Sequence, residues 1–404
     1  MRDILFLAHR IPFPPDRGDK IRSWHLLKQL ASMARVHLAC FADDEADAAH
    51  LAGLREALGD RLGEAHVEVR RRSKAQAGAM ALLSGRPVSL TLFDSPALRA
   101  FVARKLGGSD VGTVFAFSGQ MAQFVPAALS QRFIMDFGDV DSAKFAQYAD
   151  EGRGPMRWIN RREGDRLAAF ERATAARADL SLFVSEAEAT LFRARTGLPN
   201  VAALSNGIDV EVFDPEAEFE RLSASERGEG PLLLFTGQMD YPPNADAVTW
   251  CAREVLPRVP EARFVIAGRA PLPAVRALAG ERVTVTGGVA DMRSWLAAAD
   301  VVVAPLKLAR GIQNKVLEAM AMARPVVASG AAFEGIEAEP GRHLLLADGA
   351  DDTAEAINGL LAAPARAAAM GAAAQREMVR SYRWDARLAP LGQMVDPADK
   401  KAAA

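Results

Sequence analysis

The stretch ILFLAHRIPFPPDRGDKIRSWHLLKQLASMARVHLACF, residues 4–41, decides the fold class. The apolar run at residues 4–8 predicts a buried strand, and a loop rich in proline and glycine follows at residues 12–19. Apolar side chains then recur at helical spacing over about residues 20–34, and residues 36–41 predict a second strand. A strand, a loop, a helix and a strand in this order are typical of a parallel α/β sheet.

The same alternation continues along the chain and restarts after a polar stretch. We expect further strands at residues 114–117, 133–136 and 180–184, and one long helix over residues 143–178. Residues 214–230 are acidic and contain Pro215, Gly228 and Gly230, which predicts a linker. Beyond them we expect strands at residues 232–236, 263–267, 283–286, 301–304 and 325–328, and helices at residues 245–255, 292–298, 314–322, 353–361 and 364–379.

The length of 404 residues is too great for one ordinary core, so this alternation predicts two doubly wound α/β domains. Ligands of such sheets bind outside the carboxyl ends of the strands, where the strand order reverses. The formal net charge of -2 provides no strong field for nucleic acid, and we expect no nucleic-acid partner.

The cysteines and the hydropathy of the chain indicate in which cellular compartment we expect the protein. Cys40 and Cys251 lie in segments that we expect to be buried. One disulfide between them is an alternative, but we expect two free thiols in a reducing compartment. The scattered histidines have no zinc spacing, so we expect no metal. The first apolar run is too short for a signal peptide, and no run reaches the roughly 20 apolar residues that span a bilayer. We therefore expect a cytoplasmic location, with contact to the inner face of the membrane left open.

Residues 304–321, APLKLARGIQNKVLEAMA, carry the strongest chemical signal. A strand ends near residue 304 and a helix begins near Asn314, and free N–H groups at a helix start stabilise an anion such as a diphosphate. Lys315 and Glu318 are three residues apart and share a helix face. That face offers a cation for phosphate and a carboxylate for a ribose diol; the alternative is a solvated Lys–Glu pair.

This segment, with PVVA at residues 325–328, resembles the nucleotide-sugar signature of glycosyltransferase family 4. The resemblance implies the GT-B fold, in which two Rossmann-like domains face a deep cleft and a C-terminal helix crosses back to the first domain. It implies that Glu318 binds the donor ribose and that Gly18, in the first loop, lies close to the donor phosphates. The backbone of Gly288 and Val289 would contact the base. Arg22, one helical turn after Gly18, would face the cleft or lie on the surface.

Other motifs extend the resemblance over nearly the whole chain. SNGID at residues 205–209 matches the domain junction, the turn at Gly237 matches a strand-end glycine of the donor site, and SYRW at residues 381–384 matches the return of the final helix. The implied acceptor-binding domain is residues 1–205 with a returning helix at about 384–397, and the implied nucleotide-sugar domain is residues 206–383. Residues 136–142, 237–244 and 310–315 resemble most closely the branch associated with exosortase (PEP-CTERM) and exopolysaccharide loci.

The chain departs from the family pattern at two places. Arg310 stands eight positions before Glu318, where family members usually carry a first glutamate near the transferred sugar. Gln238 follows Gly237, where many relatives have cations that grip the diphosphate. Some cation must offset the charge that develops on the leaving diphosphate, and we expect Lys315 and Arg310 to do so, beside Gly311 and Asn314 at the helix start. The alternative for Arg310 is an exposed loop arginine.

Asp139 is the expected catalytic carboxylate of the first domain, because it follows a strand end. It could orient or deprotonate an acceptor hydroxyl, or it could cap the helix that starts near Ser142.

The resemblance implies a glycosyltransferase that retains anomeric configuration, needs neither metal nor cofactor, and moves sugar from a nucleotide donor to a saccharide or polyprenol-linked acceptor. A nucleotide-sugar 2-epimerase and a non-catalytic scaffold of the same fold stay open. A nicotinamide dehydrogenase does not fit, because residues 7–19 lack a G-x-G-x-x-G run.

Residues 156–172 form an arginine-rich helical pattern that could rest on anionic lipid. The alternative is a salt-bridged surface helix, since Glu163, Asp165 and Glu171 are interleaved with the arginines.

Overall fold

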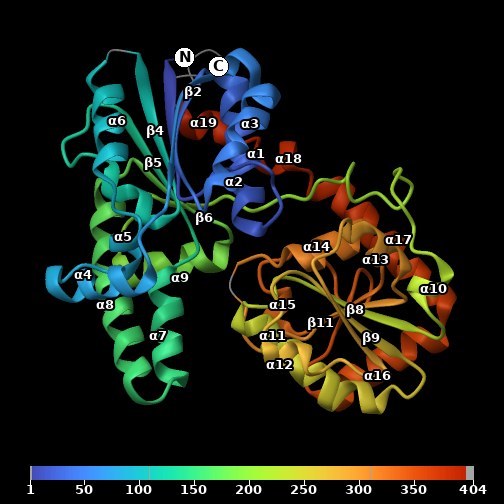
Figure 1. Ribbon diagram of the computed structural model, residues 1–404. Coiled ribbons are helices and arrows are strands. Elements are labelled where there is room, and N and C mark those ends of the chain that lie inside the picture. The colour runs from blue at the N-terminus through green and yellow to red at the C-terminus, as the bar shows by residue number, and fades with distance from the viewer. Residues whose placement is uncertain (1, 109, 310, 397–404) are drawn as a thin grey trace. The chain divides into compact units, whose positions relative to one another are not determined.

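The computed structural model describes residues 2–108, 110–309 and 311–396. Contacts divide the chain into two compact units (Figure 1). The first unit is the chain up to Ser205 joined by the chain from Leu388, and the second unit is Asn206–Arg387.

The first unit is built on a seven-stranded sheet in the order β3-β2-β1-β4-β5-β6-β7, in which every neighbouring pair is parallel. The strands are β1 (Asp3–Ala8), β2 (Val36–Ala42), β3 (Leu62–Val69), β4 (Val111–Phe117), β5 (Arg132–Gly138), β6 (Leu180–Phe183) and β7 (Val201–Ala203). The strand order reverses between β1 and β4, so the loops that follow these two strands flank the place where a ligand is expected.

Helices flank both sides of this sheet (Figure 1). They are α1 (Gly18–Met33), α2 (Glu45–Ala49), α3 (Leu51–Leu58), α4 (Lys74–Ser84), α5 (Val88–Leu92), α6 (Pro96–Gly107), α7 (Asp141–Glu151), α8 (Gly154–Arg177), α9 (Glu186–Thr196) and α19 (Leu391–Val395), with 3₁₀ turns at Gly59–Arg61 and Gly119–Phe124. The α7–α8 hairpin extends beyond the sheet, and α4 lies beside α8 (Figure 1).

The second unit repeats the plan with six parallel strands in the order β10-β9-β8-β11-β12-β13. The strands are β8 (Leu232–Thr236), β9 (Arg263–Ala267), β10 (Val283–Gly287), β11 (Val301–Ala304), β12 (Val326–Ala328) and β13 (Leu345–Leu346). The helices are α10 (Ala224–Arg227), α11 (Pro242–Trp250), α12 (Pro273–Arg276), α13 (Met292–Ala298), α14 (Asn314–Ala321), α15 (Gly330–Phe333), α16 (Ala350–Ala362) and α17 (Pro364–Ser381), and α18 (Trp384–Leu388) spans the second boundary. Here the order reverses between β8 and β11.

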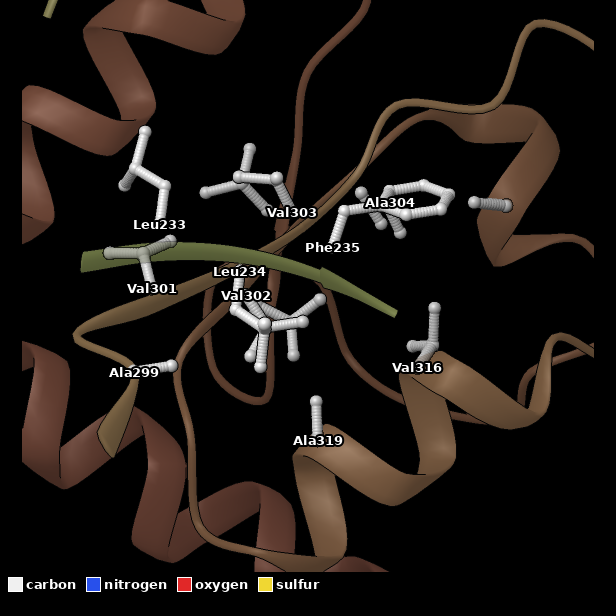
Figure 2. Packing of buried hydrophobic residues seen from close by; sticks show 14 of the residues in the cluster. Leu233, Leu234, Phe235, Ala299, Val301, Val302, Val303, Ala304, Val316 and Ala319 are labelled. Carbon is white, nitrogen blue, oxygen red and sulfur yellow. The ribbon is translucent and has the colours of Figure 1, made fainter. Parts of the chain in front are cut away.

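The central strands of the second unit are buried on both faces, which explains their unbroken apolar sequences. Leu234 and Val302 lie on the side of the sheet where Val316 and Ala319 of α14 pack (Figure 2). This packing fixes α14 beneath the sheet, with its first residue just beyond the carboxyl ends of β8 and β11.

Two expectations about elements were wrong, and a third is right in place but differs in bounds and helix type. The long helix over residues 143–178 is two helices, because Gly154, with φ +63°, begins a new helix and Pro155 follows it in the first turn of α8. Residues 214–230 are not a linker between the units: this segment lies within the second unit, where Arg227 pairs with Asp300 at 2.8 Å. The helix expected at residues 245–255 is α11, which begins at Pro242 and gives way to a wider π-type turn at Cys251–Val255.

The junction motif at residues 205–209 has a packing role. The N–H of Ile208 donates to the carbonyl of Tyr382 at 2.7 Å, and a β-carbon on Gly207 would lie 2.8 Å from the Cα of Trp384. Only glycine permits this close approach, which joins the start of the second unit to the end of α17.

Candidate functional site

Three glycine turns line one edge of the second sheet. Gly237 follows β8, Gly268 follows β9, and Gly287 ends β10. The N–H of Gly268 donates to the carbonyl of Gly287 at 3.0 Å, and a β-carbon on Gly268 would lie 1.6 Å from the carbonyl oxygen of Gly237. Because these three glycines have no side chain, their turns can pack closely together, and only backbone atoms occupy these positions at the strand ends.

Lys315, in the first turn of α14, lies at this edge in a defined position. Its Nζ donates to Oδ1 of Asn244 at 2.5 Å and lies 4.3 Å from the ring centre of Phe235. Asn244 is buried near the start of α11, and its Nδ2 donates to the carbonyl of Gln238 at 2.9 Å. A β-carbon on Gly237 would lie 3.3 Å from Nζ of Lys315, so the glycine turn and the ammonium are neighbours.

Glu318 lies one helical turn beyond Lys315, and both side chains are half-buried. Burial raises the pKa of Glu318 to about 7, and the charge of Lys315 opposes this shift. Burial lowers the pKa of Lys315 to about 7, and the charge of Glu318 opposes that shift. Burial thus disfavours the charged form of each group, so the Lys315 ammonium would gain from an anionic ligand and the Glu318 carboxylate from a hydrogen-bond donor.

The start of α14 adds further polar groups. Gln313 precedes the helix without a side-chain cap, and Oδ1 of Asn314 is buried and accepts no hydrogen bond from any described residue. Gly311, with φ +63°, lies in the loop that leads into the helix. Arg310 lies outside the described residues.

The loop predicted to contact the base follows β10 at the sheet edge. Gly288 is exposed and Val289 is half-buried. A β-carbon on Gly288 would lie 3.3 Å from Cγ of Arg269, so this loop adjoins the turn after β9. Gly237, Gly288, Val289, Gly311, Asn314, Lys315 and Glu318 thus all lie at the carboxyl ends of the second sheet or at the start of α14.

In the first unit, Asp139 lies in the loop between β5 and α7. Its Oδ1 is buried and has no hydrogen-bond partner among the described residues. Burial raises the pKa of Asp139 to about 7, and the nearby charges of Glu188 and Asp141 raise it further. Asp139 does not cap α7: Val140 is the N-cap, and its N–H donates to Glu188 at 2.7 Å.

Arg22 was expected to face the cleft or to lie on the surface; it does not lie on the surface, and its pairing leaves its guanidinium engaged within the first unit. Its guanidinium is buried and bonds Oδ2 of Asp136 through Nη2 at 2.7 Å and Nε at 3.1 Å. Asp136 is itself inaccessible to solvent and accepts from the N–H of Gly138 at 3.0 Å. Leaving either charge unpaired would be costly, so this buried pair joins α1 to the end of β5.

Gly18 is exposed at the first position of α1, next to an ion-pair network that the sequence did not reveal. Asp19 accepts from Arg10 at 2.6 Å and pairs with His9 and Arg17 at 3.1 Å each. Burial alone would raise the pKa of Asp19, but His9 and Arg10 hold it well below its usual range. Nδ1 of His9 is buried with no hydrogen-bond partner in the described part of the chain.

Cys40 and Cys251 are free, buried thiols in different units. Among the described residues, no three His, Cys, Asp or Glu side chains gather as a metal site would need. Of the helices in the described ranges, none has the length and hydropathy to cross a membrane.

Residues 230–363, which contain the glycine turns and α14, match the model of a family described as "Glycosyl transferases group 1". The chain is also similar to the GDP-mannose-dependent alpha-(1-6)-phosphatidylinositol monomannoside mannosyltransferases of Mycobacterium tuberculosis (31% identical over 238 residues) and Mycolicibacterium smegmatis (30% identical over 240 residues). Each match covers 54% of this chain, and 61% and 62% of the respective relatives, so it spans less than two thirds of their length.

Solved structures with the same architecture cover nearly all of the chain. Sucrose-phosphate synthase from Thermosynechococcus elongatus has a TM-score of 0.71 at 17% identity, with 100% of both chains covered. Anabaena HepE in complex with UDP has 0.68 at 15%, covering 98% of this chain and 100% of HepE. WaaG, a glycosyltransferase involved in lipopolysaccharide biosynthesis, has 0.69 at 14%, covering 98% and 99%. These likenesses establish the fold as GT-B, with two Rossmann-like units.

Proposed function

We propose that this protein is a glycosyltransferase that uses a nucleotide-diphosphate sugar as donor. One observation carries the proposal: the Lys315 ammonium is held by Asn244 beside the Gly237 turn, at the place where the strand order of the second sheet reverses. A half-buried cation at a helix start is suited to a diphosphate. The mannosyltransferase relatives and the family match over residues 230–363 support the same activity.

In this proposal the second unit binds the donor. The diphosphate lies against Lys315 and the first turn of α14, with Gly311, Asn314 and Arg310 near it. Glu318 accepts hydrogen bonds from the ribose diol, and the backbone of Gly288 and Val289 contacts the base. Lys315 stabilises the charge that develops on the departing diphosphate, which allows sugar transfer with retention and without a metal.

The first unit binds the acceptor, a saccharide or lipid-linked sugar of exopolysaccharide or another cell-surface glycan. Asp139 is suited to receive a proton from the acceptor hydroxyl, because its carboxylate oxygen is unpartnered among the described residues and its pKa lies near neutrality. Gly18 brings the exposed start of α1 close to the donor phosphates, and Arg22 acts as a positioning residue through Asp136.

Turnover of labelled GDP-mannose, UDP-glucose and an ADP-sugar tests the proposal. We expect Lys315→Ala and Glu318→Ala each to lower kcat/KM by roughly a hundredfold, since each removes a contact made to the donor. The matched control is Lys307→Ala, which removes an exposed lysine three residues after the end of β11, whose Nζ lies 5.8 Å from the ring centre of Trp250. It should turn over donor at the wild-type rate.

A thermal-shift measurement with GDP, UDP and ADP separates binding from chemistry. The wild type should melt at a higher temperature with its nucleotide, and Lys315→Ala should lose most of that rise. Wild-type rates in both variants would remove the site assignment. Epimerised sugar released without acceptor would identify a 2-epimerase, and no nucleotide binding at all would favour a scaffold.

A further inference from the structure

The exposed apolar side chains of this protein are concentrated on two neighbouring helices. Of the eleven large hydrophobic residues that are exposed in the described chain, six belong to α4 and the start of α8: Met80, Leu82, Leu83, Met156, Trp158 and Ile159. We call these six residues the α4–α8 surface. The other five are scattered, and such isolated residues need no explanation.

Helix α4 exposes its large hydrophobic side chains and buries small ones. It buries the small side chains of Ala77 and Ala81 completely, whereas Leu83 is 91% and Leu82 is 60% exposed. An ordinary surface helix buries its leucines and exposes small or polar residues. Leaving these leucines in water forgoes the favourable burial of their apolar surface.

The start of α8 continues this surface. Arg162 of α8 donates to the carbonyl of Ala81 in α4 at 2.6 Å, and to the carbonyl of Arg86 at 3.3 Å. These bonds fix α8 at Arg162 beside the end of α4, and Figure 1 shows the two helices next to each other. Trp158, which is 60% exposed, lies one helical turn before Arg162. Tryptophan is enriched where apolar and aqueous phases meet.

The charged residues within these two segments are all basic. Residues 70–93 contain Arg70, Arg71, Arg72, Lys74 and Arg86 and no acidic residue, and residues 153–162 contain four arginines and no acidic residue. Some of them are paired: Arg161 with Asp150 at 3.4 Å, and Arg70, Arg71 and Arg86 with Asp43, Glu45 and Asp94. Lys74, Arg153 and Arg157 are exposed and form no ion pair with a described residue. A basic rim around an apolar surface complements the anionic headgroups and acyl chains of a lipid leaflet.

Two of the three acidic residues interleaved with the arginines of α8 bond to other elements, and the third, Asp165, is exposed. The Glu163 carboxylate accepts from the N–H groups of Val88 and Ser89 at 2.7 and 2.9 Å, at the start of α5. The Glu171 carboxylate accepts from the N–H and the hydroxyl of Ser142 at 3.0 and 2.5 Å. Both acids are buried and serve neighbouring elements, so the positive charge of Arg153 and Arg157 faces outward without compensation from them.

We propose that the α4–α8 surface docks the first unit onto a membrane leaflet that contains anionic lipid, with Leu83 and Trp158 entering the interface and the arginines contacting headgroups. This inference does not depend on the proposed sugar transfer. It assigns to the surface a position in the headgroup region, where a lipid-linked acceptor would be found.

Co-sedimentation with vesicles of phosphatidylcholine and phosphatidylglycerol in equal parts tests the proposal, with pure phosphatidylcholine vesicles for comparison. The wild type should bind the anionic vesicles, and added salt should weaken the binding because it screens the arginines. Leu83→Glu combined with Trp158→Glu should lower the partition coefficient by roughly tenfold or more, and so should Arg153→Gln combined with Arg157→Gln.

Each double variant has a control of equal charge change in the second unit. Leu272→Glu with Val379→Glu alters two exposed apolar residues, and Arg366→Gln with Arg376→Gln alters two exposed arginines. Both controls should bind like the wild type, and so should Lys315→Ala, which keeps this result separate from the donor-site assay. The proposal is overturned if the wild type binds neutral and anionic vesicles equally, or neither, or if test and control variants lose binding alike.

Discussion

The ionisation of Asp139 makes the stability of the first unit depend on pH. Its pKa in the folded protein is raised to about 7 from the ordinary value of 3.8, because burial and the charges of Glu188 and Asp141 disfavour the carboxylate. The folded state therefore binds this proton more tightly than the unfolded state does. The group's destabilising effect is absent below about pH 4 and grows as pH rises towards 7.

Asp139→Asn should accordingly raise the free energy of unfolding of the first unit by about 2 kcal/mol at pH 8, and by much less at pH 4. Urea unfolding at the two pH values measures this difference. Asp246→Asn, which alters an exposed residue of α11, serves as control and should change stability little at either pH. An equal effect of Asp139→Asn at both pH values would contradict the raised pKa.

Residue spacing predicts contacts within one helix but not contacts across the fold. Lys315 and Glu318 could be assigned to one face of α14 because they are three positions apart in a helical pattern. The partner of Lys315, Asn244, lies 71 positions away, and Arg22 and Asp136 are separated by 114 positions. Nothing local distinguishes Asn244 from other asparagines at helix starts, so only its hydrogen bond to Lys315 across the fold reveals its role.

At the scale of elements, the edge of the second sheet where we propose that the donor binds depends on two turns that interlock without side chains. Gly268→Ala would place a β-carbon 1.6 Å from the carbonyl oxygen of Gly237, at a φ of +152° that side chains rarely adopt. Since the obstacle is backbone, the turns after β8 and β9 must separate, and we expect the second unit to lose about 3 kcal/mol of stability.

Gly280→Ala is the matched control, because a β-carbon there meets nothing within 4 Å. Thermal unfolding and the nucleotide-dependent rise in melting temperature should both report the difference between the two variants. A Gly268→Ala protein with wild-type stability and nucleotide binding would show that the turns can shift apart freely.

The central strands were predicted well from sequence because burial on both faces demands unbroken apolar runs, as in β8 and β11. The edge strand β3, by contrast, is mostly half-exposed and contains His66 and Glu68, so its sequence carried too weak a strand signal. Helix α4 has no buried large residue to mark its face. Neither β3 nor α4 was predicted from the sequence, and both elements have little contact with the core.

At the scale of the whole molecule, the chain crosses between the units twice, after Ser205 and after Arg387. The family resemblance implied one returning helix at about residues 384–397, and the structure has two short helices, α18 and α19, with Pro390 between them at the N-cap of α19. Helix α19 packs on α1, and Nε of Arg132 donates to the carbonyl of Met394 at 2.8 Å. The first unit is thus completed by residues from the far end of the sequence.

Leu391 tests whether this return segment stabilises the unit that carries Gly18 and Asp139. Its side chain is completely buried, so Leu391→Ala should leave a cavity and cost about 3 kcal/mol. The control is Leu346→Ala, which truncates a leucine that is 40% exposed on β13.

Hydrogen exchange read by mass spectrometry should show faster exchange in α1 of Leu391→Ala, although α1 lies more than three hundred residues earlier in the sequence. Peptides from β8 and α14 should exchange at wild-type rates. Faster exchange throughout both units would mean that they unfold together, and unchanged exchange in α1 would mean that the first unit is stable without its C-terminal helix.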